Sequence, residues 1–227
     1  MIVRTLQLGT ALVVLCLASP AIAGDDSQAW MTASATVKLT ERWRLSEDIT
    51  ARFSDDRNGL YEVESNTLIG YRLDKVTTIW AGYTHDPQYA AGDFAVMEHR
   101  AREQVTFDSF AKFGPGKLSG RLRLEQRWRE GIDGTGWRVR PYIKYALPFP
   151  KAGRTALILS IEPFINLNNT TFQRTDGLDR IRSLIAISTP LAKNLTAEIG
   201  YLNQHTFVRN GPDSDDHVAS ISLSLAL

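Results

Sequence analysis

A strict two-residue alternation of apolar and charged positions runs through the segment from Lys117 to Glu130. The apolar set is Leu118, Leu122, Leu124 and Trp128, and the charged set is Arg121, Arg123, Glu125, Arg127 and Arg129. Because successive side chains of a strand point to opposite faces, this segment is predicted to be a strand with one apolar and one charged face. The pattern recurs along nearly the whole chain without a helical segment, which favours a closed barrel standing in lipid.

Eleven strands are predicted from this alternation. They cover residues 30–39, 43–53, 60–73, 77–85, 95–111, 117–130, 137–147, 155–168, 178–189, 195–206 and 217–227. Their lengths suit a tilted membrane strand of ~9 to 11 residues or somewhat more. Short connections alternate with longer polar ones, predicted at 54–59, 86–93, 131–136, 169–177 and 207–216, as in bacterial outer-membrane barrels. The predicted fold is therefore all-β: an antiparallel, up-and-down transmembrane β-barrel of 10 to 12 strands.

The odd number of strands conflicts with the even number that bacterial single-chain barrels almost always have. With eleven alternating strands, the first and the last would run in the same direction. Two alternatives restore an even number: residues 30–39 lie outside the wall, which leaves ten strands, or one more strand exists, which gives twelve. Pro141 and Pro163 fall within predicted strands, and because proline removes a ladder hydrogen bond, both are predicted to mark bulges.

The first 23 residues have the features of a secretory signal peptide. Arg4 gives a positive start, an apolar run follows from Leu6 to Leu17, and Ala21-Ile22-Ala23 is a small-x-small cleavage site. The mature domain would then be residues 24–227, located in the outer membrane of a Gram-negative cell. The single cysteine, Cys16, lies within the signal, so the mature protein would have no disulfide and no thiol nucleophile.

Net charge and aromatic placement agree with this interpretation. Removing Arg4 from the 26 Lys and Arg leaves 25, equal to the 25 Asp and Glu. A neutral total argues against a nucleic-acid partner, because phosphates select a basic surface. Aromatic residues near strand ends could form girdles at the two membrane interfaces. These are Trp43, Phe53, Tyr71, Tyr83, Phe107, Trp128, Trp137, Tyr145 and Tyr201.

Several local patterns resemble one bacterial family. They are Trp30 near the mature start, Glu98-His99-Arg100, Glu103-Gln104, Glu125-Gln126-Arg127, the Arg138 to Tyr142 strand, Glu162 with Asn166 and Asn168, Gly200 to Gln204, and His217. Together they resemble the proteins grouped as domain of unknown function 2490 (DUF2490), over essentially the whole mature chain. The resemblance implies an outer-membrane barrel and no particular activity. One departure is the last residue, Leu227, where outer-membrane barrels tend to end on an aromatic residue.

The inward face of the barrel is the predicted functional site. Its candidate residues are Glu98, Arg100, Arg102, Arg121, Arg123, Glu125, Arg127, Arg129, Arg138, Arg140, Glu162, Arg180, Arg182 and Glu198. In one interpretation these charges pair and plug a narrow lumen, since buried charges persist only when paired. In the other, unpaired arginines line a narrow porin-like pore or binding cavity that selects a small anionic solute.

Two further functional classes are compatible with the sequence. A lipid hydrolase would need a base at the outer rim, where His85 with Asp86, His99, His205 with Thr206, and His217 with Ser220 are candidates. No pair has diagnostic spacing and no Gly-x-Ser-x-Gly elbow exists, so we expect the protein not to be an enzyme. A soluble periplasmic β-sandwich would also show alternation. The expected partners are membrane lipid and, in the pore or cavity interpretation, the small anion, with no metal and no cofactor, and the oligomeric state is left open.

Overall fold

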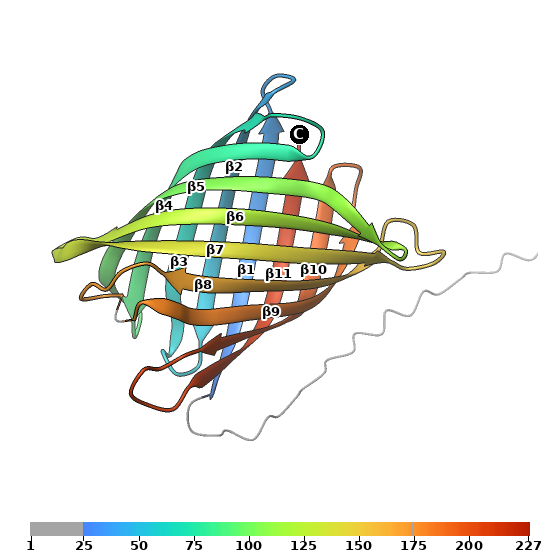
Figure 1. Ribbon diagram of the computed structural model, residues 1–227. Helices are drawn as coiled ribbons and strands as arrows, with labels where there is room; N and C mark the ends of the chain where they lie inside the picture. The colour runs from blue at the N-terminus through green and yellow to red at the C-terminus, as the bar shows by residue number, and fades with distance from the viewer. Residues whose placement is uncertain (1–24, 174) are drawn as a thin grey trace, which may run out of the picture.

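The computed structural model describes residues 25–173 and 175–227, and it places eleven strands in one closed barrel (Figure 1). The predicted signal peptide, residues 1–23, and Gly24 lie outside the described residues. The strands are β1 (Asp25–Lys38), β2 (Trp43–Ser54), β3 (Gly59–Arg72), β4 (Thr77–Ala90), β5 (Asp93–Phe113), β6 (Gly116–Arg129), β7 (Ile132–Pro148), β8 (Ala156–Asn166), β9 (Gly177–Pro190), β10 (Leu195–Thr206) and β11 (Ser214–Ala226). The all-β prediction and the count of eleven are confirmed. In the described ranges, no helix is long and apolar enough to cross a membrane.

The barrel closes through a parallel ladder between β1 and β11. Their register runs from Asp25 opposite Asp215 to Thr36 opposite Ala226, whereas every other neighbouring pair is antiparallel. Figure 1 shows the two strands side by side with their arrows pointing the same way. The alternatives of ten and of twelve strands are therefore wrong, because residues 25–38 form part of the wall and their pairing leaves no open edge. A β-sandwich is excluded by the same closure.

The two faces of the wall follow the alternation. Apolar side chains such as Leu122, Ile185 and Ile199 are exposed on the outside, and the charged positions of the same strands point into the lumen. Aromatic residues join this outer surface near both ends: Trp43 contacts Tyr71, with ring centres 5.0 Å apart. This arrangement is the reverse of a water-soluble protein and suits an apolar surrounding.

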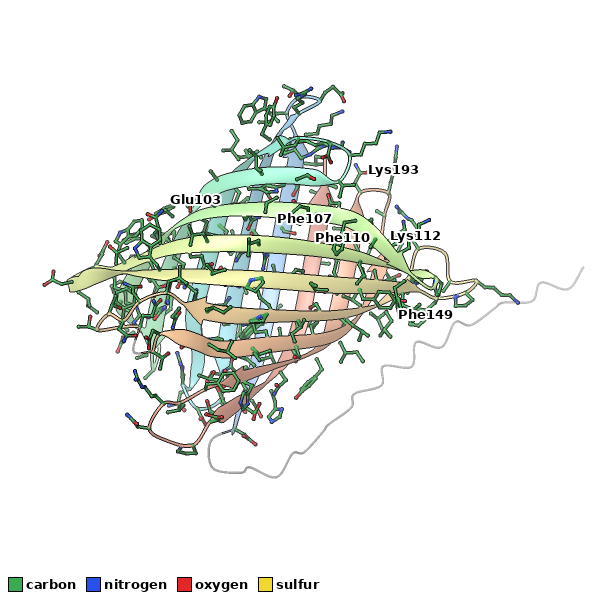
Figure 2. All side chains as sticks on the ribbon, in the orientation of Figure 1. Glu103, Phe107, Phe110, Lys112, Phe149 and Lys193 are labelled. Carbon is green, nitrogen blue, oxygen red and sulfur yellow. The ribbon has the colours of Figure 1, made fainter. Side chains whose placement is uncertain are left out.

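Acidic side chains also occur on the outer surface of the barrel, among them Glu47 and Glu103. Glu47 on β2 accepts a hydrogen bond of 2.7 Å from Ser65 Oγ and another from Thr67 Oγ1, both on β3. Glu103 on β5 lies outside the wall, where Gln126 donates to it at 3.4 Å (Figure 2). Hydrogen bonding lowers the cost of placing a carboxyl group on an otherwise apolar surface.

The connections define two different ends of the barrel. The loop end, where β1 begins, carries residues 55–58, 91–92, 130–131, 167–173, 175–176 and 207–213, and the turn end carries 39–42, 73–76, 114–115, 149–155 and 191–194. The longer loops predicted at 86–93 and 131–136 are wrong, because β4 continues to Ala90 and β7 starts at Ile132. Ala91 (φ 51°) and Gly92 (φ 88°) form a tight two-residue turn instead. At the turn end, the backbone N–H groups of Val76 and Thr77 donate to Asp74 at 2.7 Å and lower the pKa of its carboxyl group.

The two prolines interrupt one ladder without shifting its register. Between β7 and β8 the pairing stops after Val139 opposite Ile165 and resumes at Ile143 opposite Ile161, which places Pro141 opposite Pro163 in the gap. The bulge predicted at Pro141 is wrong, because its pairing with Leu122 on β6 is also in continuous register. Near Pro163 the register does shift, one residue later, between Phe164 and Ile165 on the β9 side. Proline lacks the N–H that a ladder needs, so facing prolines leave a gap rather than a bulge.

Candidate functional site

The lumen is filled at its middle by charged side chains from β5, β6 and β7. The strand register sets Arg102 opposite Glu125, and Glu125 opposite Arg138. The inward charges of these strands that are buried are Glu98, Arg100, Arg102, Arg123, Glu125, Arg127, Arg138 and Arg140. The alternation therefore brings these predicted site residues into one cluster, because even-numbered positions of β5 and β7 and odd-numbered positions of β6 share the inner face.

Glu125 is the centre of the first group of ion pairs. Its side chain has 0% exposure, and Arg138 donates to its Oε2 from Nε at 2.9 Å and from Nη2 at 2.6 Å. Its Oε1 accepts from Arg140 Nη1 at 2.8 Å and lies 3.5 Å from Arg123 Nη1. Arg140 also donates to Glu162 at 3.0 Å, and Arg121 binds the same carboxylate. One chain of ion pairs thus crosses from β6 through β7 to β8.

Glu98 is the centre of the second group. It also has 0% exposure and accepts hydrogen bonds from Arg127 at 2.8 and 3.0 Å, from Arg129 Nε at 2.7 Å and from Arg100 Nε at 2.6 Å. Arg100 extends this group across the lumen by pairing with Asp86 and, at 3.0 Å, with Glu64. Charges this deeply buried are stable only when each is paired and hydrogen-bonded, and both centres meet that condition.

Arg102, which is buried, and Arg182, which is half-buried, have no carboxylate within 4.0 Å among the described residues. Arg102 donates to Asn66 and lies 3.3 Å from Thr84 Oγ1. Arg182 donates from Nε to Gln204 at 2.8 Å, and its guanidinium carbon lies 4.4 Å from the ring centre of Trp30 and 4.7 Å from that of Phe164. Aromatic faces attract cations, so the two rings partly replace an acid.

The remaining predicted residues lie at the margins of this network. Arg180 pairs with Asp179 at 2.7 Å near the loop end. Glu198 is half-buried and, within the described ranges, forms no ion pair with the network. Asp86 was assigned from sequence to an outer loop, whereas it lies fully buried on β4. The signal that identifies it is parity, because Thr84 and Asp86 continue the inward positions of that strand.

Cavities lie on either side of the network. The lumen chamber, about 160 Å³, opens toward the loop end and is lined by arginines, among them Arg129, Arg180 and Arg182. A second cavity of about 370 Å³ at the turn end is lined by Leu68, Trp80 and Leu227 among others. Neither cavity includes Arg102, Arg123 or Glu125. These three buried side chains lie between the cavities and separate them.

One group of carboxylates has the proximity that a metal ion requires. Oxygen atoms of Glu62, Glu64 and Asp86 lie within 4.8 Å of one another. Arg52 pairs with Glu62 and with Glu64, and Arg100 pairs with Glu64 and Asp86. Two guanidinium groups therefore already supply the positive charge that a cation would bring to these oxygens.

The four histidines lie on the outer surface of the barrel, not in the lumen. Side chains on neighbouring positions of a strand point to opposite faces. His205 and Thr206, His85 and Asp86, and His217 and Ser220 therefore point to opposite sides of the wall. Their partners in the structure are outer residues: Tyr201 Oη lies 2.6 Å from His217 Nδ1, and His99 Nε2 lies 3.1 Å from Glu130. The base–nucleophile pairs considered for a lipid hydrolase do not form.

Comparison with known proteins places this barrel in a family. An uncharacterized protein of Methylorubrum extorquens AM1 is 26% identical over 200 residues, which cover 88% of this chain and 87% of that protein. No solved structure matches the chain. The family model described as "Protein of unknown function (DUF2490)" matches residues 27–215. Because that match covers most of the chain, including all or part of every strand, the protein belongs to the DUF2490 family.

Proposed function

We propose that this protein is a non-enzymatic outer-membrane barrel whose lumen is closed at its middle and binds a small anion in the chamber at the loop end. The outward apolar side chains and the inward charges support a membrane location, as does the signal-like sequence of residues 1–23. Closure is supported by Glu98 and Glu125, which have no exposure and each contact three arginines. Ions crossing the lumen would have to break these pairs.

The proposal of anion binding rests on the hydrogen bonds that three arginines of the chamber make. Arg129, Arg180 and Arg182 each donate to a protein acceptor through Nε alone. Among the residues that the structure describes, their Nη1 and Nη2 atoms have no protein acceptor, and all three side chains line the same chamber. The planar guanidinium group suits carboxylate and phosphate, and fixed positive charge in a recess concentrates anions.

Two measurements on the purified protein test this function. In planar bilayers we expect conductance at the background level. Stable anion-selective conductance would show that the lumen is an open pore and would contradict its closure. In nonionic detergent, titration calorimetry should detect binding of inorganic phosphate. Arg180→Gln should weaken it about tenfold, because one charge-assisted contact is lost. Arg42→Gln, in a turn at the opposite end, is the matched control, and absence of phosphate binding by the wild type would overturn the binding role.

Location is tested separately by cell fractionation. The mature protein should remain with membranes after urea washing and should migrate differently on gels before and after heating. Recovery only in the soluble periplasmic fraction would contradict the proposed location.

A further inference from the structure

A further cavity lies at the mouth of the barrel and is continuous in its lining with the lumen chamber. It measures about 490 Å³ and is bordered by Phe172, Gln173 and Thr175, which follow β8, and by residues of the connection 207–213. Arg127, Arg129 and Arg180 line both this mouth cavity and the lumen chamber. The two spaces therefore meet at three cationic side chains, two of which have unused Nη donors.

One part of the lining of the mouth cavity is apolar. It contains Phe172 from one connection and Phe207 and Val208 from the other. Phe172 lies over the arginines, with its ring centre 5.6 Å from the guanidinium carbon of Arg127 and 5.1 Å from that of Arg129. Cationic donors and aromatic surface are thus within a few ångströms of each other.

Gln173 holds the segment 167–173 in place. Its Nε2 donates to the backbone carbonyl of Asn168 at 2.8 Å and to that of Trp137 at 3.1 Å, and its Oε1 accepts from Arg127 at 3.1 Å. Gln173 is buried despite lying outside the strands. The position of Phe172 is therefore coupled to the arginine cluster, and the mouth cavity is largely pre-formed, as ligand sites usually are.

We propose that the mouth cavity binds amphipathic carboxylates, with the carboxylate against Arg129 and Arg180 and the apolar body against Phe172 and Phe207. This inference rests on the proposed anion-binding function and specifies the class of anion. A simple inorganic anion leaves the aromatic side unused, and a neutral apolar molecule leaves the Nη donors unpaired. The volume falls within the range of small-molecule sites, about 300 to 1,000 Å³. Free aromatic acids and acyl chains released from lipids both have this chemistry.

Titration calorimetry in nonionic detergent with five probes tests the inference: acetate, inorganic phosphate, benzoate, octanoate and benzyl alcohol. Benzoate or octanoate should bind about tenfold more tightly than acetate, because the cavity buries their apolar part. Benzyl alcohol should not bind measurably. Tighter binding of benzoate would indicate an aromatic acid as the source, and tighter binding of octanoate a lipid-derived chain.

Matched variants test whether the apolar lining of the mouth cavity causes the preference for amphipathic carboxylates. Phe207→Ser should abolish the preference for the amphipathic probe over acetate and leave phosphate binding unchanged, whereas Phe94→Ser, on an exposed residue outside the mouth cavity, should change neither. Phosphate binding without any preference for benzoate or octanoate would overturn this inference and leave the proposed function standing. Equal binding of benzyl alcohol and benzoate would also overturn it. Absence of binding by every anion would overturn both.

Discussion

Replacing Glu125 with glutamine should destabilise the barrel strongly. The substitution keeps the shape of the side chain and one oxygen acceptor, but it removes the negative charge that Arg123, Arg138 and Arg140 share. Arg140 keeps Glu162 at 3.0 Å, and Arg123 keeps Gln104 at 3.0 Å. Neither Arg138 nor Arg123 has another carboxylate within 4.0 Å among the described residues, so two buried guanidinium groups are left without an acid. Breaking a buried pair costs roughly 3 to 5 kcal/mol, a large part of a typical folding free energy.

The assay is urea unfolding of the detergent-solubilised protein, followed by the mobility difference between folded and unfolded barrel on gels. Glu125→Gln should lower the unfolding midpoint clearly, and Glu41→Gln, in an exposed turn where it pairs with Lys38, should stay near the wild type. Adding Arg138→Gln to Glu125→Gln should recover part of the loss, because it removes one of the two charges that have lost their acid. A Glu125→Gln midpoint equal to that of the wild type would refute the view that paired charges hold the lumen closed.

Three other predictions concern the inner face of the wall, its outer face and the sequence that precedes the first strand. The double variant Arg121→Gln, Arg123→Gln should lose less stability than Glu125→Gln, because Glu162 and Glu125 both keep Arg140; a larger loss in urea unfolding would contradict the assigned partners. Leu122→Arg places a cation on the outer face, where Leu122 is 49% exposed, and should cost about 2 to 4 kcal/mol near the middle of a bilayer. Wild-type heat stability of that variant in membranes would mean that the outer face does not contact lipid. N-terminal sequencing of the membrane-extracted protein should begin at Gly24, and a retained Met1 would disprove the signal peptide.

The strand pattern was predictable because the inward charges are placed with strict parity. Arg121 to Arg129 alternate with apolar residues, and the structure keeps that alternation along β6. Residues 86–93 resemble a loop in sequence, because Asp86, Pro87 and Gly92 are residue types common in turns. Asp86 and Gln88 are polar because they face the lumen, so β4 extends further than composition alone indicates.

Closure and pairing were not predictable from the sequence. Whether β1 pairs with β11 depends on the curvature accumulated over all eleven strands, and no local pattern in residues 25–38 reports it. The partners of Glu98 could not be predicted for a similar reason. Arg129 is 31 positions away in sequence, and which of several arginines pairs with Glu98 depends on how far each side chain reaches across the lumen. Gln173 was missed because it belongs to a connection, where alternation carries no information.

The parallel ladder between β1 and β11 places the start of the first strand and the end of the last at opposite ends of the barrel. A peptide joining Asp25 to Ala226 would have to run the full height of the wall, so a circular permutant with a short linker is ruled out. In a barrel with an even number of strands the two ends lie at the same end of the barrel, and a short linker can join them. Reporter domains fused next to these two residues would stand on opposite sides of any layer that the barrel spans. The start of β1 and the end of β11 therefore lie on opposite sides of that layer.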